Sequence, residues 1–485
     1  MSTTPHPGTR RQFLQAGAVA AGGLVALRGW ASVASGRRPT DVRIGEVRIS
    51  FEDFVYRAPV KFAGAIMDRA TVLTVRCRAT TPDGQSAEGV GYMPFNHIFS
   101  YPSKSMSHEA KNDAMKALAH EIARVTERLG EHGHPLDLNW LLAPEYLKAA
   151  AEVSARLKLP DPIPKLCTLV TAAAFDAAIH DAYGKRHGVS VFATYNAQFM
   201  GNDLSRYLGA EYKGRYPGDF LLKAPKPRMP LCHMISAVDP IEAFQNSKPL
   251  RDGLPETMPE WIAHNGLIEF KIKVNGDDLA WDIERVAHID RVVRAAQEKR
   301  GVREWFHVLD FNEKCPDLDY FTRFLEGLKA KMGETYSKIR YVEQPTARDL
   351  RRRPPLRMHA AAKLCPVVID ESLVDVESLL LAKELGWTGA VVKSPKGLSA
   401  MLLITSVAGK ENIYLAGGDM SCPGGALVQT ANFQARVPTI TSVEANVRQF
   451  FPAGNTAWEP RYPGIFRVKD GLMKTGDLTG PGLGA

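Results

Sequence analysis

The sequence contains few cysteines, and none of them falls in a pattern that binds a structural metal. There is no CxxC pair and no Cys/His spacing suited to zinc. This excludes a zinc-stapled fold and a small disulfide-rich scaffold. We therefore expect isolated buried thiols at Cys77, Cys167, Cys232, Cys315, Cys365 and Cys422. The chain also has no tandem repeat of fixed period, which argues against a repeat architecture.

An apolar run long enough for a membrane span of roughly 20 residues is also missing. The apolar stretch within residues 9–27 is short and rich in alanine and glycine, and it follows the paired Arg10 and Arg11. Small residues come next, in "WASVAS" at 30–35. This pattern resembles a twin-arginine export signal, with a basic amphipathic start or a single anchor as the alternatives. We expect residues 1–35 to be removed and the mature protein to be periplasmic or extracellular, without a stable membrane span.

A strong excess of one charge is absent once that signal is set aside. Residues 1–35 hold three arginines and no acidic residue, so their removal lowers the formal net charge from +8 to +5. The basic run "RDLRRRPPLR" at 348–357 is interpreted as a solvated surface. We therefore expect no nucleic-acid partner.

A chain of 485 residues with 45% hydrophobic content can bury a large core, and its length suggests more than one domain. Strand-like alternation at about 41–110 gives way to helical periodicity at about 110–195. From about 230 onward, short apolar strands alternate with helices, which favours parallel pairing. Eight such strands fit a (β/α)₈ barrel: "PLCHMIS", "IEFKIKV", "WFHVLDF", "IRYVEQP", "PVVIDES", "GAVVKSP", "NIYLAGG" and "TITSVEA".

Charged residues stand at the ends of consecutive predicted strands, where the chemistry of such barrels is located. In chain order they are Lys271, Lys273, Asp310, Glu343, Asp370 and Lys393. Three carboxylates in the centre can hold a hard divalent cation through oxygen ligands. Mg²⁺ suits this set, and Mn²⁺ is an alternative. Lysines flank the carboxylates on both sides.

This arrangement suits removal of the proton α to a carboxylate. A cation can neutralise the charge that develops on the substrate as an enediolate forms. A lysine must be neutral to act as a base, and a neighbouring ammonium lowers its pKa. The closeness of Lys271 and Lys273, which alternate along one strand face, is therefore expected to help make Lys273 a base.

The motifs that carry these residues resemble those of the enolase superfamily, in its muconate-lactonizing-enzyme-like (mandelate racemase/muconate cycloisomerase-type) subgroup. "KIK" is similar to the subgroup's KxK motif, "VLDFNEK", "YVEQPT" and "VVIDESL" to its metal-binding strands, and "VVKSPKG" to its sixth strand. The resemblance implies Lys273 as base, Lys271 as its helper and Lys393 as acid or base on the opposite face. It implies Asp310, Glu343 and Asp370 as ligands of one Mg²⁺. Asn312 would support Asp310 and is also a candidate substrate-binding residue.

The resemblance also implies a domain organisation. After the signal (1–35), it gives an α+β capping domain with a linker at 41–229 and a (β/α)₈-type barrel at 230–455. A C-terminal segment, 456–485, returns to the capping domain. The stretch "FAGAIMDR" (62–69) resembles the loop that touches the distal part of the substrate.

The sequence also departs from the subgroup. An insertion is indicated around "AQEKRGVRE", and the linker at about 195–229 is long. Dipeptide epimerases carry an acidic DxD motif on strand eight to bind the substrate ammonium. Here the alignable residues are Glu444 and Asn446, with Asp419 nearby, so at most one acid of that pair is kept.

Several alternatives stay open. Glu371 could replace Asp370 as ligand if Asp370 caps a helix, and we expect Lys396 and Glu313 to face solvent. An aldolase-like Schiff-base barrel and a non-catalytic binding protein are competing classes. Lysines on both faces favour a racemase or epimerase acting on a small carboxylate, over a cycloisomerase or a dehydratase (β-elimination). We expect a homo-oligomer.

The export prediction can be tested directly. Replacing Arg10 and Arg11 by lysine should leave the uncleaved precursor in the cytoplasm, because the twin-arginine pathway reads that pair. Cell fractionation and immunoblotting would measure this, with a Lys104→Arg variant as control. Cleaved protein outside the cytoplasm in the double variant would contradict it.

Overall fold

The structure, a computed structural model, describes residues 37–484, and the predicted signal lies outside the described residues. All six cysteines are free and buried, which confirms the expectation of isolated thiols. Between residues 37 and 484, no helix combines the length and the apolar character needed to cross a bilayer.

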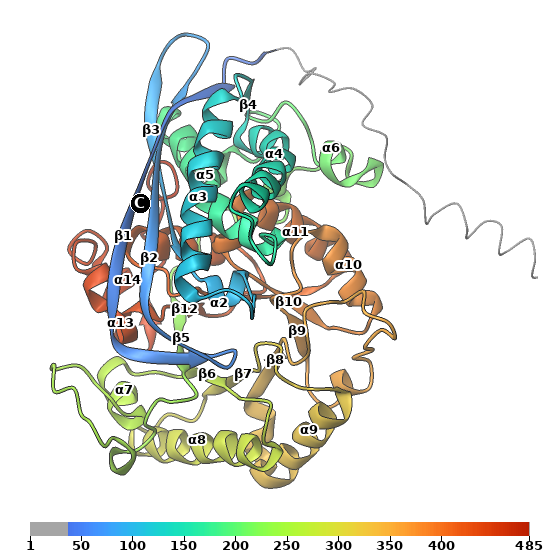
Figure 1. Cartoon of the computed structure of the whole chain (residues 1–485). Helices are drawn as coiled ribbons and strands as arrows, with labels where there is room; N and C mark the ends of the chain where they lie inside the picture. The colour runs from blue at the N-terminus through green and yellow to red at the C-terminus, as the bar shows by residue number, and fades with distance from the viewer. Residues whose placement is uncertain (1–36, 485) are drawn as a thin grey trace, which may run out of the picture. The chain divides into compact units, whose positions relative to one another are not determined.

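The first part of the fold is built on an antiparallel sheet with the strand order β3-β2-β1-β4. Positive φ angles at Ala63 and Gly64 form the tight turn between β1 and β2, and this long hairpin reaches down to the second sheet in Figure 1. The register of β1 against β2 shifts between Val55 and Val60, so residues 56–59 form a bulge. The strands are β1 (Val42–Phe62), β2 (Ala65–Thr80), β3 (Ser86–Phe95) and β4 (His132–Gly133).

Helices cover one face of this sheet. The side chain of Ser107 accepts a hydrogen bond from the Ala110 N–H and so caps α3, while α5 is rich in alanine and almost entirely buried. Small residues let α5 approach β3 closely at Gly89 and Gly91, whose backbones contact the helix backbone. The helices are α2 (His97–Ser100), α3 (His108–Arg128), α4 (Pro135–Arg156) and α5 (Lys165–Arg186).

The long linker that follows contains only short helical turns. They are η1 (Val191–Thr194), α6 (Ser205–Leu208), η2 (Ala210–Tyr212) and η3 (Pro217–Asp219).

The second part of the fold is a curled parallel sheet with the order β11-β10-β9-β8-β7-β6-β5-β12. Each predicted strand is present, because each is a short apolar run bounded by turn residues. The strands are β5 (Met229–Ile235), β6 (Glu269–Lys273), β7 (Phe306–Asp310), β8 (Ile339–Glu343), β9 (Val367–Ile369), β10 (Gly389–Val392), β11 (Tyr414–Gly417) and β12 (Val443–Glu444).

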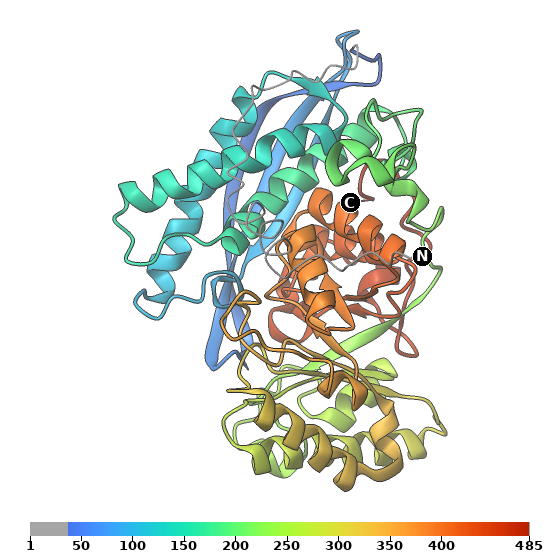
Figure 2. The same ribbon diagram turned by 90° about the vertical axis from the view of Figure 1, so that its right-hand side faces the viewer.

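Helices connect these strands along the outside of the curled sheet (Figure 1 and Figure 2). Between β8 and β9 the connection holds only a short 3₁₀ turn, η6 (Ala361–Lys363). The other connections contain α7 (Met258–Asn265), α8 (Leu279–Lys299), α9 (Leu318–Met332), η5 (Gly333–Lys338), α10 (Val376–Glu384), η7 (Ser394–Lys396), α11 (Leu398–Glu411) and α12 (Gly424–Gln434).

Among the described residues, no backbone ladder joins β11 to β12, so the sheet is a curled half-barrel. Side chains link the two strands instead. The Leu415 N–H donates to Thr439 Oγ1, and the Asn446 N–H donates to the carboxylate of Asp419. A fully closed barrel stays a prediction.

The C-terminal segment contacts the curled sheet and helix α5. After α13 (Val447–Phe450) and α14 (Pro463–Phe466), β13 (Leu472–Met473) pairs antiparallel with β5. Further on, the Leu483 N–H donates to Asp181 on α5 at 2.9 Å. This segment therefore fastens the curled sheet to the helices of the first part.

The close approach of β3 to α5 gives a stability prediction. A Cβ at Gly91 would overlap the carbonyl oxygen of Ala174, so Gly91→Ala should lower the free energy of unfolding by about 1–3 kcal/mol. Gly45→Ala on β1 is the control, because a Cβ there meets no atom within 4 Å. Urea denaturation would measure both, and equal stability of the two variants would refute the packing argument.

Candidate active site

The parallel register of the curled sheet places the predicted site residues side by side. In the strand register, Lys273 of β6 lies next to Asp310 of β7, and Asp310 lies next to Glu343 of β8. Asp370 and Lys393 directly follow β9 and β10. Each is 6% exposed or less, so the ends of five consecutive strands bring ionisable groups into one buried cluster.

Both lysines of β6 point to the same carboxylate. Lys273 Nζ lies 2.5 Å from Asp310 Oδ2, and Lys271 Nζ lies 3.1 Å from the same oxygen. Lys271 also donates to Glu343 Oε1 at 2.9 Å and to Glu444 Oε2 at 3.3 Å. Alternation along β6 therefore puts two ammonium groups on one face, where three carboxylates surround them.

The other end of the cluster contains a second pair of lysines. Lys393 Nζ lies 2.5 Å from Asp370 Oδ2 and 4.5 Å from the centre of the Phe99 ring. Lys396 Nζ lies 2.8 Å from Asp370 Oδ1 and is fully buried. The expectation that Lys396 faces solvent is wrong, because the 3₁₀ turn η7 folds it back onto Asp370. Glu313 is half-buried in an ion pair with Arg348.

The electrostatics of the cluster follow from burial and from these ion pairs. Burial raises the pKa of Asp310, but Lys273 and Lys271 outweigh it and lower the value to about 2. Burial and the neighbouring Asp310 raise the pKa of Glu343 well above its usual range. Burial lowers the pKa of Lys271, yet Glu343, Glu444 and Asp310 together raise it well above its usual value, so Lys271 stays protonated.

The structure distinguishes Asp370 from Glu371. The carboxylate of Asp370 faces the cavity with Asp310 and Glu343, and Asp375, not Asp370, caps the next helix, α10. Glu371 does not line this cavity and accepts a hydrogen bond from Asn312 Nδ2 at 3.0 Å. Asn312 in turn contacts Lys273 Nζ through its Oδ1 at 2.9 Å. Asn312 therefore links Glu371 to Lys273, and its backbone has a positive φ of 43°.

The candidate substrate residues on the last two strands are also present at the cavity, but their acids are already engaged. Glu444 Oε1 accepts from Asn446 Nδ2 at 2.6 Å, and its other oxygen contacts Lys271. Asp419 accepts from the backbone N–H groups of Cys422 and Asn446 at 2.9 and 3.2 Å. Burial and the nearby Glu444 raise the pKa of Asp419 to about 6.

Apolar side chains close the cavity above the charges. The cavity has a volume of about 40 Å³, and its wall includes Val60 and Met67 of the β1–β2 hairpin. Met67 belongs to the predicted loop 62–69. The remaining apolar lining residues are Tyr56, Phe99, Met234 and Met420, and of these only Phe99 and Tyr56 are aromatic. Sequence reasoning missed these wall residues because nothing in their local pattern distinguishes them from core.

The donor set fits a hard divalent cation. In residues 37–484, no three carboxylate, imidazole or thiol groups already surround one point, because lysines occupy the space between the carboxylates. However, Glu343 Oε2 is buried without a hydrogen-bond partner, and the three carboxylates offer only oxygen ligands. Mg²⁺ therefore suits Asp310, Glu343 and Asp370 chemically.

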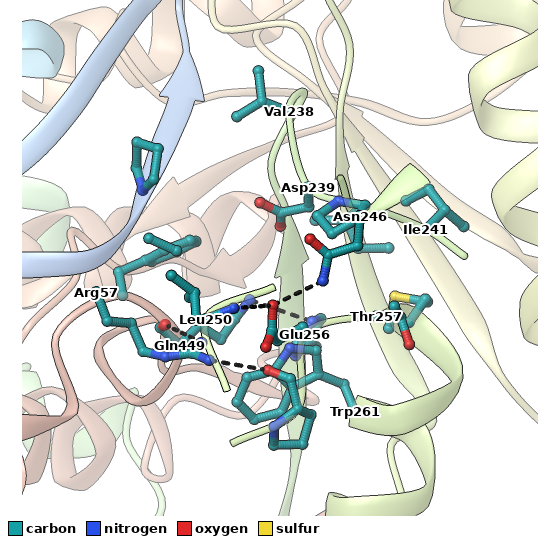
Figure 3. A pocket seen from close by; sticks show the side chains of 18 of the residues that line it. Arg57, Val238, Asp239, Ile241, Asn246, Leu250, Glu256, Thr257, Trp261 and Gln449 are labelled. Carbon is teal, nitrogen blue, oxygen red and sulfur yellow. Dashed lines mark hydrogen bonds between the residues drawn. The ribbon is translucent and has the colours of Figure 1, made fainter. Parts of the chain in front are cut away.

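A second, larger cavity has a volume of about 240 Å³, and Figure 3 shows the side chains that line it. On β5, His233 and Ile235 line it, whereas Met234 between them lines the cavity of the charged cluster. Arg57, in the β1 bulge, also lines this cavity and donates a hydrogen bond of 3.2 Å to the carbonyl oxygen of Gln449. The predicted site residues lie outside this second cavity, so the chemistry is assigned to the smaller one.

Comparison with known families agrees with the sequence motifs. Residues 254–485 match the family described as "Enolase C-terminal domain-like". This stretch contains every lysine and carboxylate of the cluster. No match is found among curated protein sequences.

Solved structures with the same fold extend over nearly the whole chain. The L-Ala-D/L-Glu epimerase from Bacillus subtilis has a TM-score of 0.59 at 17% identity, covering 91% of this chain and 98% of its own. Muconate lactonizing enzyme from Pseudomonas fluorescens has a TM-score of 0.56 at 17% sequence identity, and the match covers 91% of this chain and 96% of that enzyme. A dipeptide epimerase from Cytophaga hutchinsonii was solved in complex with Mg and the dipeptide D-Ala-L-Val. It has a TM-score of 0.59 at 16% sequence identity, and the match covers 91% of this chain and 95% of that enzyme. The structural neighbours are thus enolase-superfamily isomerases, and at these identities the likeness establishes the fold.

Proposed function

We propose that this protein is an Mg²⁺-dependent enzyme that removes the proton α to a substrate carboxylate, and that it acts as a racemase or epimerase. The observation that carries the proposal is the placement of Lys273 and Lys393 at opposite ends of one row of carboxylates. A binding protein would have no need for a buried lysine on each side. An aldolase-like lysine would not need three carboxylates at consecutive strand ends.

The chain's own groups would divide the work as follows. When bound by Asp310, Glu343 and Asp370, Mg²⁺ would supply positive charge for the substrate carboxylate. A cation held by Asp310 and Asp370 would replace Lys273 and Lys393 as the partner of those carboxylates, and each Nζ could then turn toward the substrate. Each Nζ can then take or give a proton on one face of the α-carbon. Lys271 stays charged and keeps the cluster electrostatically balanced.

The cavity supports a substrate whose distal part is apolar and has no ammonium group. Glu444 and Asp419 are the acids in the place where an ammonium would bind, and both are satisfied by Lys271, Asn446 and backbone N–H groups. The wall above them is built from methionine, valine and aromatic side chains. An N-acyl amino acid or a related acid fits this lining better than a dipeptide with a free amine.

A cycloisomerase or a dehydratase is the second candidate. Muconate lactonizing enzymes stand among the structural neighbours beside the epimerases, and such reactions need a base on one face only. Separate substitutions of Lys273 and Lys393 can therefore distinguish a reaction with one base from a reaction with two.

Deuterium uptake from solvent tests the proposal. Lys273→Ala should reduce exchange from one enantiomer of a substrate by at least about 100-fold, and Lys393→Ala should do so for the other. A panel of N-acyl amino acids, hydroxy acids and dipeptides, followed by NMR, would identify the substrate. Full turnover by Lys393→Ala with both enantiomers would leave Lys273 as the sole base and favour cycloisomerisation or elimination.

The metal assignment is tested separately by calorimetric titration with Mg²⁺. Asp310→Asn, Glu343→Gln and Asp370→Asn should each weaken Mg²⁺ binding at least about tenfold, because each removes a charged ligand. Glu371→Gln is the matched control and should bind Mg²⁺ nearly as well as the unmodified protein. Affinity lost in the Glu371 variant and kept in the Asp370 variant would reverse the assignment of the third ligand.

A further inference from the structure

The helix that follows Lys393 lacks a side-chain cap of its own. Only residues 394–397 separate Lys393 from α11, and the residue at the N-cap position is Gly397, which has no side chain. The first N–H groups of a helix need an acceptor, and a buried helix end without one is costly. In both Figure 1 and Figure 2, α11 lies beside the helices of the first part of the fold.

The missing cap comes from α5. Asp176, 5% exposed, accepts from the Ser399 N–H at 2.8 Å through Oδ2 and from Ser399 Oγ at 2.6 Å through Oδ1. Asp176 and Ser399 are 223 residues apart in the chain. A carboxylate on one part of the fold thus caps a helix on the other. A capping interaction of this kind fixes the position of the first helical turn.

A buried histidine and tyrosine complete this arrangement. His180, one turn further along α5, has its Nε2 2.9 Å from Ser399 Oγ, and its Nδ1 is 3.0 Å from the hydroxyl of Tyr195. His180 is fully buried, and Tyr195 is 1% exposed. Every polar side-chain atom of Asp176, His180 and Ser399 therefore has a partner, as a rigid buried network requires.

We propose that Asp176 is a positioning residue: it clamps the 394–399 loop to α5 and so fixes where Lys393 is presented to substrate. Gly397 fits this role, because a Cβ there would lie 3.2 Å from Asp176 Oδ2 in a backbone region, φ +90°, that glycine favours. The catalytic consequence rests on the proposed function, whereas the clamp itself does not. Lys273, on β6, is held by Asp310 and Asn312 and does not depend on this contact.

The clamp is tested first without any substrate. Amide hydrogen exchange, followed by mass spectrometry, should become at least about tenfold faster in a peptide covering 394–401 of Asp176→Asn. Asp181→Asn is the matched control on the same helix. Its carboxylate is buried too, but it binds the N–H groups of Val90 and Leu483 and does not contact the loop. Unchanged exchange in the Asp176 variant would overturn the proposal.

The catalytic consequence is tested by the direction of proton exchange. Asp176→Asn should lower solvent deuterium exchange with the enantiomer served by Lys393 about 10- to 100-fold, and leave the enantiomer served by Lys273 nearly unchanged. Equal loss for both enantiomers would indicate general destabilisation and refute a positioning role. Ser399→Ala, a milder change that keeps the backbone N–H, should show the same asymmetry to a smaller degree.

The two proposals fail in different ways. If the unmodified protein exchanges no α-proton with any carboxylate tested, the proposed function fails, while the exchange of the 394–401 peptide still decides whether the clamp exists. If the protein exchanges protons but Asp176→Asn shows no asymmetry, the proposed function stands and the positioning role falls.

Discussion

Removing charges from water at the ends of the parallel strands is the constraint on which the rest of the structure depends. A buried carboxylate or ammonium is tolerated only when an opposite charge and further hydrogen bonds replace its hydration. The register of β6, β7 and β8 meets this condition, because it places Lys273, Asp310 and Glu343 in adjacent positions. Removing any one of these charges would leave its partner buried without a counter-charge, which destabilises the fold. Each lysine is therefore structurally needed as the counter-charge of its carboxylate, and in the proposed function a metal ion would take over that part.

The wall of the cavity and its charged floor are held in place by different kinds of contact. The charged floor comes from the curled sheet, whose strand ends are fixed by backbone ladders. The apolar wall comes partly from the β1–β2 hairpin and its bulge at 56–59, which are held by side-chain contacts such as that of Arg57 with Gln449. The charged floor therefore comes from the curled sheet alone, whereas both parts of the fold contribute to the apolar wall.

The sequence allowed the strands and the charged floor to be predicted because both are local signals. An apolar run ending in Asp, Glu or Lys is visible within seven residues, as in "VVIDESL" for Asp370. Other features depend on contacts that no short window contains. Lys396 follows Lys393 by three residues, and its inward direction is set by a 3₁₀ turn. The pairing of Asp176 with Ser399 joins distant segments, and the bulge in β1 appears only when β1 is paired with β2.

The contact between Leu483 and Asp181 has a consequence for how the chain folds during synthesis. The two residues are 302 positions apart, and β13 adds a second long-range pairing with β5. While a ribosome is still making the curled sheet, the buried Asp181 carboxylate lacks one of its final hydrogen-bond donors, and the outer side of β5 is uncovered. The N-terminal part can therefore collapse early but cannot reach its final stability until the closing segment emerges. Folding should be slow and governed by non-local contacts, and the nascent chain should be a good client for chaperones.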